Sequence, residues 1–125
     1  MNSREKSKSE TKILGIDPGS IRCGFGLIGL NKKNSFYITS GTINPPSSKP
    51  LHFRLNHIYQ SLIEIMHKYT PDDIVVEKIF FAKGMKAALS LGHARGVVLL
   101  AAASENVNLH ECSALEVKKA VVGYG

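Results

Sequence analysis

The chain has 125 residues, of which 43% are hydrophobic and 21% are charged. This length is typical of one domain, and the composition supplies enough apolar side chains for a buried core. We find no stretch that approaches the ~20 apolar residues of a membrane span, and the polar start of the chain lacks the apolar segment of a signal peptide. We therefore expect a cytoplasmic protein with no membrane partner.

The charge is positive, with 16 Lys and Arg against 10 Asp and Glu, a net charge of +6 and a pI near 9.4. Such a balance indicates a polyanionic partner but does not identify one. Part of it belongs to residues 1–11, which we expect to form a disordered basic tail. Residues 12–125 would then form the folded domain.

The cysteines and histidines give no sign of a zinc site. Cys23 and Cys112 lie in apolar stretches without a CxxC pattern, so we expect both to be reduced thiols in the core. The five histidines do not have metal-ligand spacing.

Three strands are predicted first, at residues 12–17, 23–30 and 36–43, from their apolar, aromatic and β-branched side chains. The first connection begins with Pro18 and Gly19, where proline fixes φ and glycine permits a left-handed residue. Because the connections are short, we expect the three strands to form an antiparallel meander.

Helix-linked strands follow. Apolar residues at steps of three and four predict a helix from Leu51 to Tyr69, ended by residues 70–72. Residues 74–77 then form a buried strand, parallel to its neighbour because it is reached through a helical crossover. A second helix at about 86–104, a strand at 107–111 and a short helix opened by a capping box at 113–116 complete an α/β mixed sheet with flanking helices.

Two glycines, Gly92 and Gly96, lie on one face of the second predicted helix. Each costs about 1 kcal/mol relative to alanine in a helix interior. They therefore suggest close approach by another backbone, either that of the sheet or that of a partner subunit.

Two carboxylates, Asp17 and Glu77, each end an apolar strand. If these strands are parallel neighbours, both side chains lie at one edge of the sheet, where ligands of open sheets gather. Close carboxylates repel each other unless a cation lies between them, and one or two Mg²⁺ ions with substrate phosphate suit such a site. The alternative is that Asp17 only starts a turn and Glu77 only ends a strand.

The loop at 78–84 contains Phe80, Phe81 and Lys83. Aromatic rings stack on unpaired bases and lysine contacts phosphate, so this loop is a candidate DNA-binding element. Equally, one phenylalanine could cover the core while the lysine is solvated. Lys118 and Lys119 could contact phosphate or stabilise a helix carboxyl end.

Four segments together resemble the RuvC family of Holliday-junction resolvases: residues 13–20 (ILGIDPGS), 76–83 (VEKIFFAK), 88–96 (ALSLGHARG) and 117–123 (VKKAVVG). They follow in the family's order and spacing. The resemblance runs from about Lys12 to Gly125.

The resemblance implies a ribonuclease H-like fold, a homodimer and Mg²⁺-dependent symmetric nicking of four-way junction DNA in recombination and repair. It further implies cooperation with the RuvA–RuvB branch-migration complex. Asp17 and Glu77 would be catalytic carboxylates that bind two metal ions. Lys118 would be a basic catalytic residue near the scissile phosphate, and Phe80 the aromatic at the junction centre. Gly92 and Gly96 would lie at the dimer interface.

The sequence departs from the family in one respect. The family completes its metal site with two further acidic residues, three apart, beyond the Gly123 region, whereas this sequence ends at Gly125. We therefore expect a fragment that cleaves weakly or not at all. Two alternatives stay open: a catalytically incomplete junction-binding module, and a lobe of an actin- or chaperone-type ATPase, whose first strand also ends in Asp-x-Gly.

Overall fold

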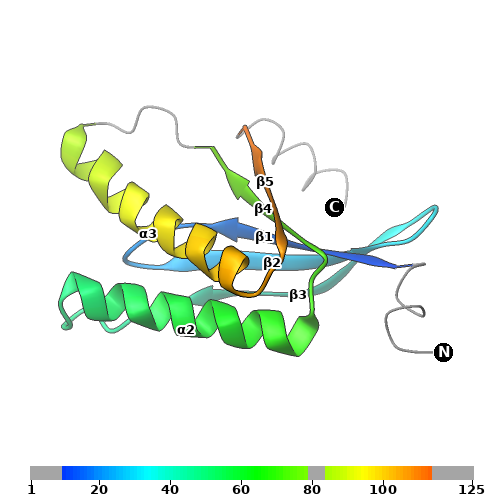
Figure 1. Ribbon diagram of the computed structural model, residues 1–125, viewed down its shortest axis with the longest axis horizontal. Helices are drawn as coiled ribbons and strands as arrows, with labels where there is room; N and C mark the ends of the chain where they lie inside the picture. The colour runs from blue at the N-terminus through cyan, green and yellow to red at the C-terminus, as the bar shows by residue number, and fades with distance from the viewer. Residues whose placement is uncertain (1–9, 79–83, 114–125) are drawn as a thin grey trace.

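The computed structural model describes residues 10–78 and 84–113. Within these ranges a five-stranded sheet has the strand order β3-β2-β1-β4-β5 and is accompanied by two long helices (Figure 1). The strands are β1 (Thr11–Asp17), β2 (Cys23–Leu30), β3 (Ser35–Ile43), β4 (Asp73–Glu77) and β5 (Asn108–Cys112). The helices are α2 (Leu51–Tyr69) and α3 (Met85–Ser104).

The sheet is mixed, as the sequence predicted. β1 pairs antiparallel with β2, and β2 with β3, whereas β4 runs parallel to β1 and β5 parallel to β4. The short turns after β1 and β2 reverse the chain, and the helices α2 and α3 carry it back to the start of the next parallel strand. The carboxyl ends of β1, β4 and β5 therefore lie at one edge.

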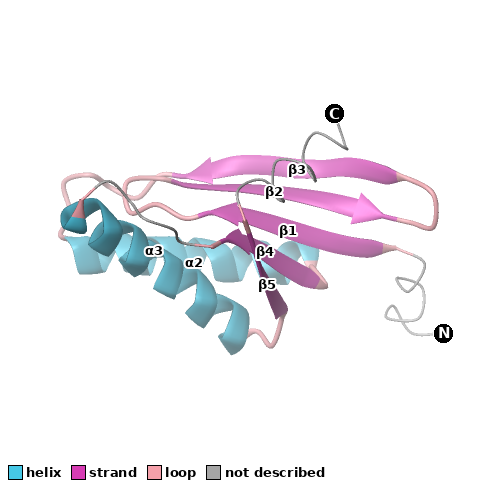
Figure 2. Cartoon of the chain, turned by 90° about the horizontal axis from the view of Figure 1, so that it is seen from above, coloured by secondary structure: helices cyan, strands magenta, loops and turns pink. Residues whose placement is uncertain are grey.

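The core lies between one face of the sheet and both helices. Alternate residues of the strands point to this face, and the helices contribute inward stripes at steps of three and four. The fully buried larger side chains include Leu14 and Leu27 from the antiparallel strands, Ile74 and Val76 from β4, and Ile58, Leu62 and Val98 from the helices. Figure 2 shows α2 and α3 side by side against the sheet.

The boundaries of the helices have local causes. Thr70 ends α2 in the left-handed conformation (φ 47°), its N–H bonding to the carbonyl of Met66, and Pro71 follows and cannot continue the helix. Gly84 precedes α3 with φ of 90°, a conformation that glycine adopts without strain.

Three expectations need correction. Thr11, which we assigned to the tail, pairs with Leu30 in β1. Gly19 does not have a positive φ; it is needed because a Cβ there would lie 2.3 Å from the carbonyl oxygen of Arg22. Finally, α3 is long and apolar enough to pass for a membrane span by length and composition, although this is weak evidence because core helices of soluble proteins pass the same test.

Several expected features lie outside the described residues. These are the tail up to residue 9, the centre of the 78–84 loop, and the helix expected after Ser113.

Candidate metal site and family membership

The candidate site is built from the ends of neighbouring strands. The last residue pair between β1 and β4 joins Ile16 to Val76, so the next residues on these strands are Asp17 and Glu77. Parallel neighbours are about 4.8 Å apart, which places the two carboxylates within reach of one cation. The parallel register thus brings together two side chains that are 60 residues apart in the sequence.

Both carboxylates belong to the face of the sheet opposite the helices. Ile16 and Val76 are buried against the helices, so strand alternation turns Asp17 and Glu77 to the other side, and both are exposed. An exposed position lets a metal ion and a phosphate approach without desolvating a carboxylate in the core.

The same row of the sheet continues on both sides of this pair. Gly24 of β2 is the antiparallel partner of Asp17, and a Cβ at Gly24 would lie 3.7 Å from the Cβ of Asp17. On the other side, Cys112 of β5 pairs with Glu77. Glycine therefore leaves one flank of the carboxylate pair open, while a half-buried thiol borders the other flank.

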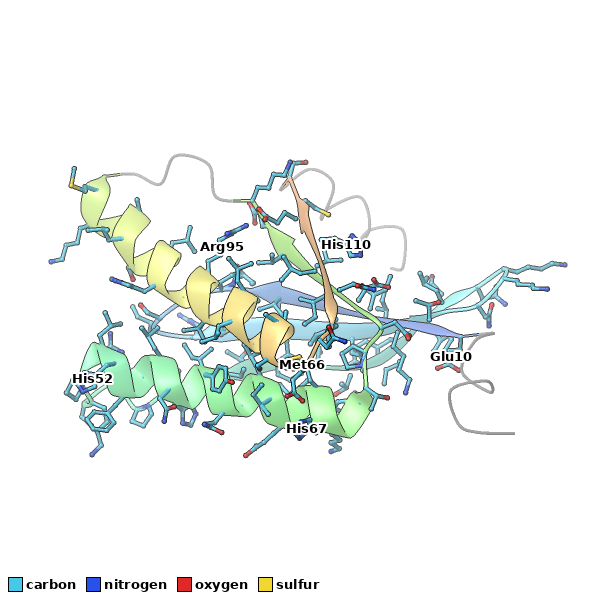
Figure 3. The ribbon with its side chains drawn as sticks, in the orientation of Figure 1. Glu10, His52, Met66, His67, Arg95 and His110 are labelled. Atoms are coloured by element: carbon cyan, nitrogen blue, oxygen red, sulfur yellow. The ribbon has the colours of Figure 1, made fainter. Side chains whose placement is uncertain are left out.

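The Cys112 flank is fastened to its surroundings. The N–H of Lys78 donates a 2.7 Å hydrogen bond to the carbonyl of Cys112, which prolongs the β4–β5 pairing past Glu77. Arg95 of α3 forms an ion pair with Glu111 of β5, and Figure 3 shows Arg95 extending from the helix towards the strands. The Arg95 side chain is largely buried, whereas Glu111 is exposed, so this pair anchors α3 to the edge strand.

The sequence analysis did not identify Gly24, Cys112 or the Arg95–Glu111 pair as neighbours of the site. Gly24 and Cys112 can be identified as neighbours of the carboxylates only once the strand register is known. Arg95 belongs to a segment that resembles the family, but the sequence alone does not show that it pairs with Glu111.

Two carboxylates are fewer ligands than a self-sufficient metal site contains. Among residues 10–78 and 84–113, no group of three or more His, Cys, Asp or Glu side chains could hold a metal ion. The pair nevertheless suits Mg²⁺, which is commonly held by one or two carboxylates together with substrate phosphates. Of the predicted DNA contacts, Phe80, Phe81, Lys83, Lys118 and Lys119 lie outside the described residues.

The structure excludes one of the two explanations for the helix glycines, namely close approach by the sheet. Gly92 and Gly96 are exposed, and a Cβ at either would meet no described atom within 4 Å. The sheet is therefore not the backbone that approaches them. The same outward side of α3 carries Met85, Leu89 and Leu100, which are 81%, 58% and 60% exposed.

The mixed sheet, with three antiparallel strands followed by helix-linked parallel ones and acidic residues at the ends of β1 and β4, defines the ribonuclease H-like class. Within this class the chain belongs to the crossover junction endodeoxyribonuclease RuvC family, whose sequence profile matches residues 13–125.

Relatives in sequence agree with this placement. The chain is 46% identical over 115 residues to the crossover junction endodeoxyribonuclease RuvC of Legionella pneumophila (strain Lens) and 42% identical over 113 residues to that of Desulforamulus reducens. These matches cover 92% and 90% of this chain. They cover 66% and 69% of the relatives, so the chain spans about two thirds of their length.

Solved structures show the same fold. Thermus thermophilus RuvC in complex with a Holliday junction substrate superposes with a TM-score of 0.80 at 26% identity, covering 88% of this chain and 69% of that one. The yeast mitochondrial Holliday junction resolvase Ydc2, at 14% identity and a TM-score of 0.61, covering 82% of this chain and 53% of that one, shares the fold. These similarities do not favour the ATPase-lobe alternative.

Cys23 provides a test of the packing beside Asp17. Burial raises the pKa of the Cys23 thiol from 9.0 to about 11, a hydrogen bond with the backbone of Gly19 opposes this rise, and the nearby charge of Asp17 adds to it. Cys23 is fully buried and unpaired, as expected.

We predict that the free energy of unfolding falls by about 1–3 kcal/mol between pH 9 and pH 11 because of this thiol. Because folding raises the pKa of the thiol, the folded protein keeps this proton at a pH where the unfolded chain has lost it. The stability that the protonated thiol contributes is therefore complete below pH 9 and is lost as the pH rises through about 11. Urea unfolding across this range, compared with Cys23→Ala, measures it. Equal pH dependence in the two proteins would contradict the assignment.

Proposed function

We propose that this chain acts in a Holliday-junction resolving endonuclease, one that nicks two opposed strands of a four-way DNA junction symmetrically during recombination and repair. The observation that carries the proposal is the adjacency of Asp17 and Glu77 on one exposed face of the sheet. Family membership supports the substrate class, and the net charge of +6 suits a polyanionic partner.

Asp17 and Glu77 would hold Mg²⁺, with two ions in a complete site. Bound Mg²⁺ supplies the charge that activates an attacking water and stabilises the leaving oxygen of a phosphodiester. The residues of the chain orient the reaction: the strand ends fix the two carboxylates, and Gly24 keeps the flank of Asp17 open.

The DNA contacts in this proposal come from two segments. Phe80 and Phe81 would stack on bases at the opened junction centre, while Lys83 and Lys119 would contact phosphates. Lys118 would act near the scissile phosphate as a catalytic residue. The protein would work in the cytoplasm with the RuvA–RuvB complex, as the family resemblance implies.

We further propose that the outward face of α3 is the homodimer interface. Contiguous exposed apolar side chains on a soluble protein commonly mark a protein interface. Gly92 and Gly96 lie within this face with open space above them, so a partner backbone can approach closely there. This account also explains why α3 is apolar on both sides.

Substitution of Asp17 tests the catalytic role. The assay measures nicking of a labelled four-way junction in Mg²⁺, with the chain in excess over the DNA. Asp17→Asn removes a metal ligand and should abolish that nicking while junction binding in EDTA is retained or tightened. Denaturing gels and mobility-shift titrations measure the two.

Nicking that persists in Asp17→Asn would contradict the catalytic role of Asp17. Junction binding without any metal-dependent change would favour the non-catalytic binding module.

A charge on the outward face of α3 tests the dimer. Leu89→Lys should weaken self-association by roughly tenfold or more, because it places a charge in an apolar interface. Tyr37→Lys on β3, where the tyrosine is 69% exposed, is the matched control and should leave association unchanged. Sedimentation equilibrium gives the dissociation constants, and equal constants for the two variants would place the interface elsewhere.

A further inference from the structure

The turn that follows Asp17 is held in place by side chains from both helices. On the α2 side, Arg54 donates from Nε to the carbonyl oxygen of Ser20 at 3.5 Å and from a terminal nitrogen to the carbonyl of Lys49 at 2.8 Å. On the α3 side, the hydroxyl of Ser20 lies 2.8 Å from the hydroxyl of Ser90. The turn is thus connected to elements far from it in the sequence.

Ser20 is the buried polar member of this arrangement. It is 6% exposed, so its hydroxyl has little access to water and depends on a protein partner. Ser20 is three residues after Asp17, and the intervening Pro18 and Gly19 leave little freedom: proline fixes φ, and Gly19 lies against the carbonyl of Arg22. A displacement at Ser20 is therefore transmitted to the end of β1.

Ser90 lies on the inward side of α3. It is one turn ahead of the buried Ala94, with Val98 and Ala101 further along the same stripe. The residues that follow Ser90 in this inward stripe are apolar. Ser90 is the member of the stripe whose hydroxyl contacts the turn, through Ser20.

We propose that Ser90 is a positioning residue of the metal site: through its hydrogen bond to Ser20 it fixes the turn after Asp17 and so holds the Asp17 carboxylate beside Glu77. This inference rests on the proposed function, because it concerns the same carboxylate pair. It assigns to α3 a part in forming the site, although α3 covers the opposite face of the sheet.

Ser90→Ala tests the proposal in the whole chain with two readouts, neither of them nicking. The first is hydrogen–deuterium exchange of the backbone amides of residues 19–23 without metal. The second is the dissociation constant for Mn²⁺, which serves as a probe for a hard oxygen-ligand site. Loss of one hydrogen bond, with a buried hydroxyl left unpaired, should accelerate exchange and weaken Mn²⁺ binding, each by roughly two- to tenfold.

Two further variants separate positioning from general stability. Ser90→Thr keeps the hydroxyl and should restore both readouts towards those of the unsubstituted chain. Ser104→Ala is the matched control: it removes another α3 hydroxyl, one that accepts a 3.2 Å hydrogen bond from Tyr59, at the far end of the helix. We expect it to leave the 19–23 amides and the Mn²⁺ affinity unchanged.

Faster exchange in Ser90→Ala with unchanged Mn²⁺ affinity would overturn the proposal and leave Ser90 as a structural residue. Equal effects of Ser90→Ala and Ser104→Ala would overturn it as well. If the unsubstituted chain bound no Mn²⁺, the carboxylate pair itself would fail as a metal site, and the inference with it. That result is distinguishable from the first two, which leave metal binding by the unsubstituted chain intact.

Discussion

The parallel pairing of β1 with β4 is the constraint on which the rest of the structure depends. Its register places Asp17 next to Glu77, although the two residues belong to segments separated by two strands and a helix. A slip of one residue would turn one carboxylate towards the helices and expose part of the core. The same register therefore specifies both the buried face and the candidate metal site.

The two helices have different relations to this sheet. α2 has one buried stripe, and its exposed residues are polar apart from Phe53, as is typical of an amphipathic surface helix. α3 is apolar on its outer side too, where Leu89 and Leu100 are exposed, and the hydroxyl of Ser90 reaches the turn beside Asp17 on its inner side. Proteins rarely expose such a face without a use for it, so α3 links the core, the proposed interface and the candidate site.

Most of the fold could be predicted because its signals are local. Apolar periodicity gave the helix at Leu51–Tyr69, and short turns gave the antiparallel meander. The crossover rule also gave the parallel strand that ends at Glu77. The surroundings of the two helix glycines could not be predicted, because a glycine in a sequence does not show whether its neighbour is the sheet or another subunit. The structure shows open space at Gly92 and Gly96 among the described residues.

The residues that surround the two carboxylates could not be predicted from the sequence either. That Gly24 and Cys112 flank the pair depends on strand register, and the Ser20–Ser90 contact joins residues 70 apart. These are long-range facts without a periodic signature. By contrast, Asp17 and Glu77 could be singled out because each ends an apolar run, and chain topology then implied that they meet.

The most direct test of this account is paramagnetic broadening of backbone amide signals by substoichiometric Mn²⁺ in the isotope-labelled chain. We predict that broadening is centred on Asp17 and Glu77 and reaches Gly24 and Cys112 across the neighbouring strands. It should disappear in a variant carrying Asp17→Asn and Glu77→Gln. Broadening centred elsewhere, or unchanged in that variant, would contradict the claim that strand register brings these two carboxylates together as a metal site.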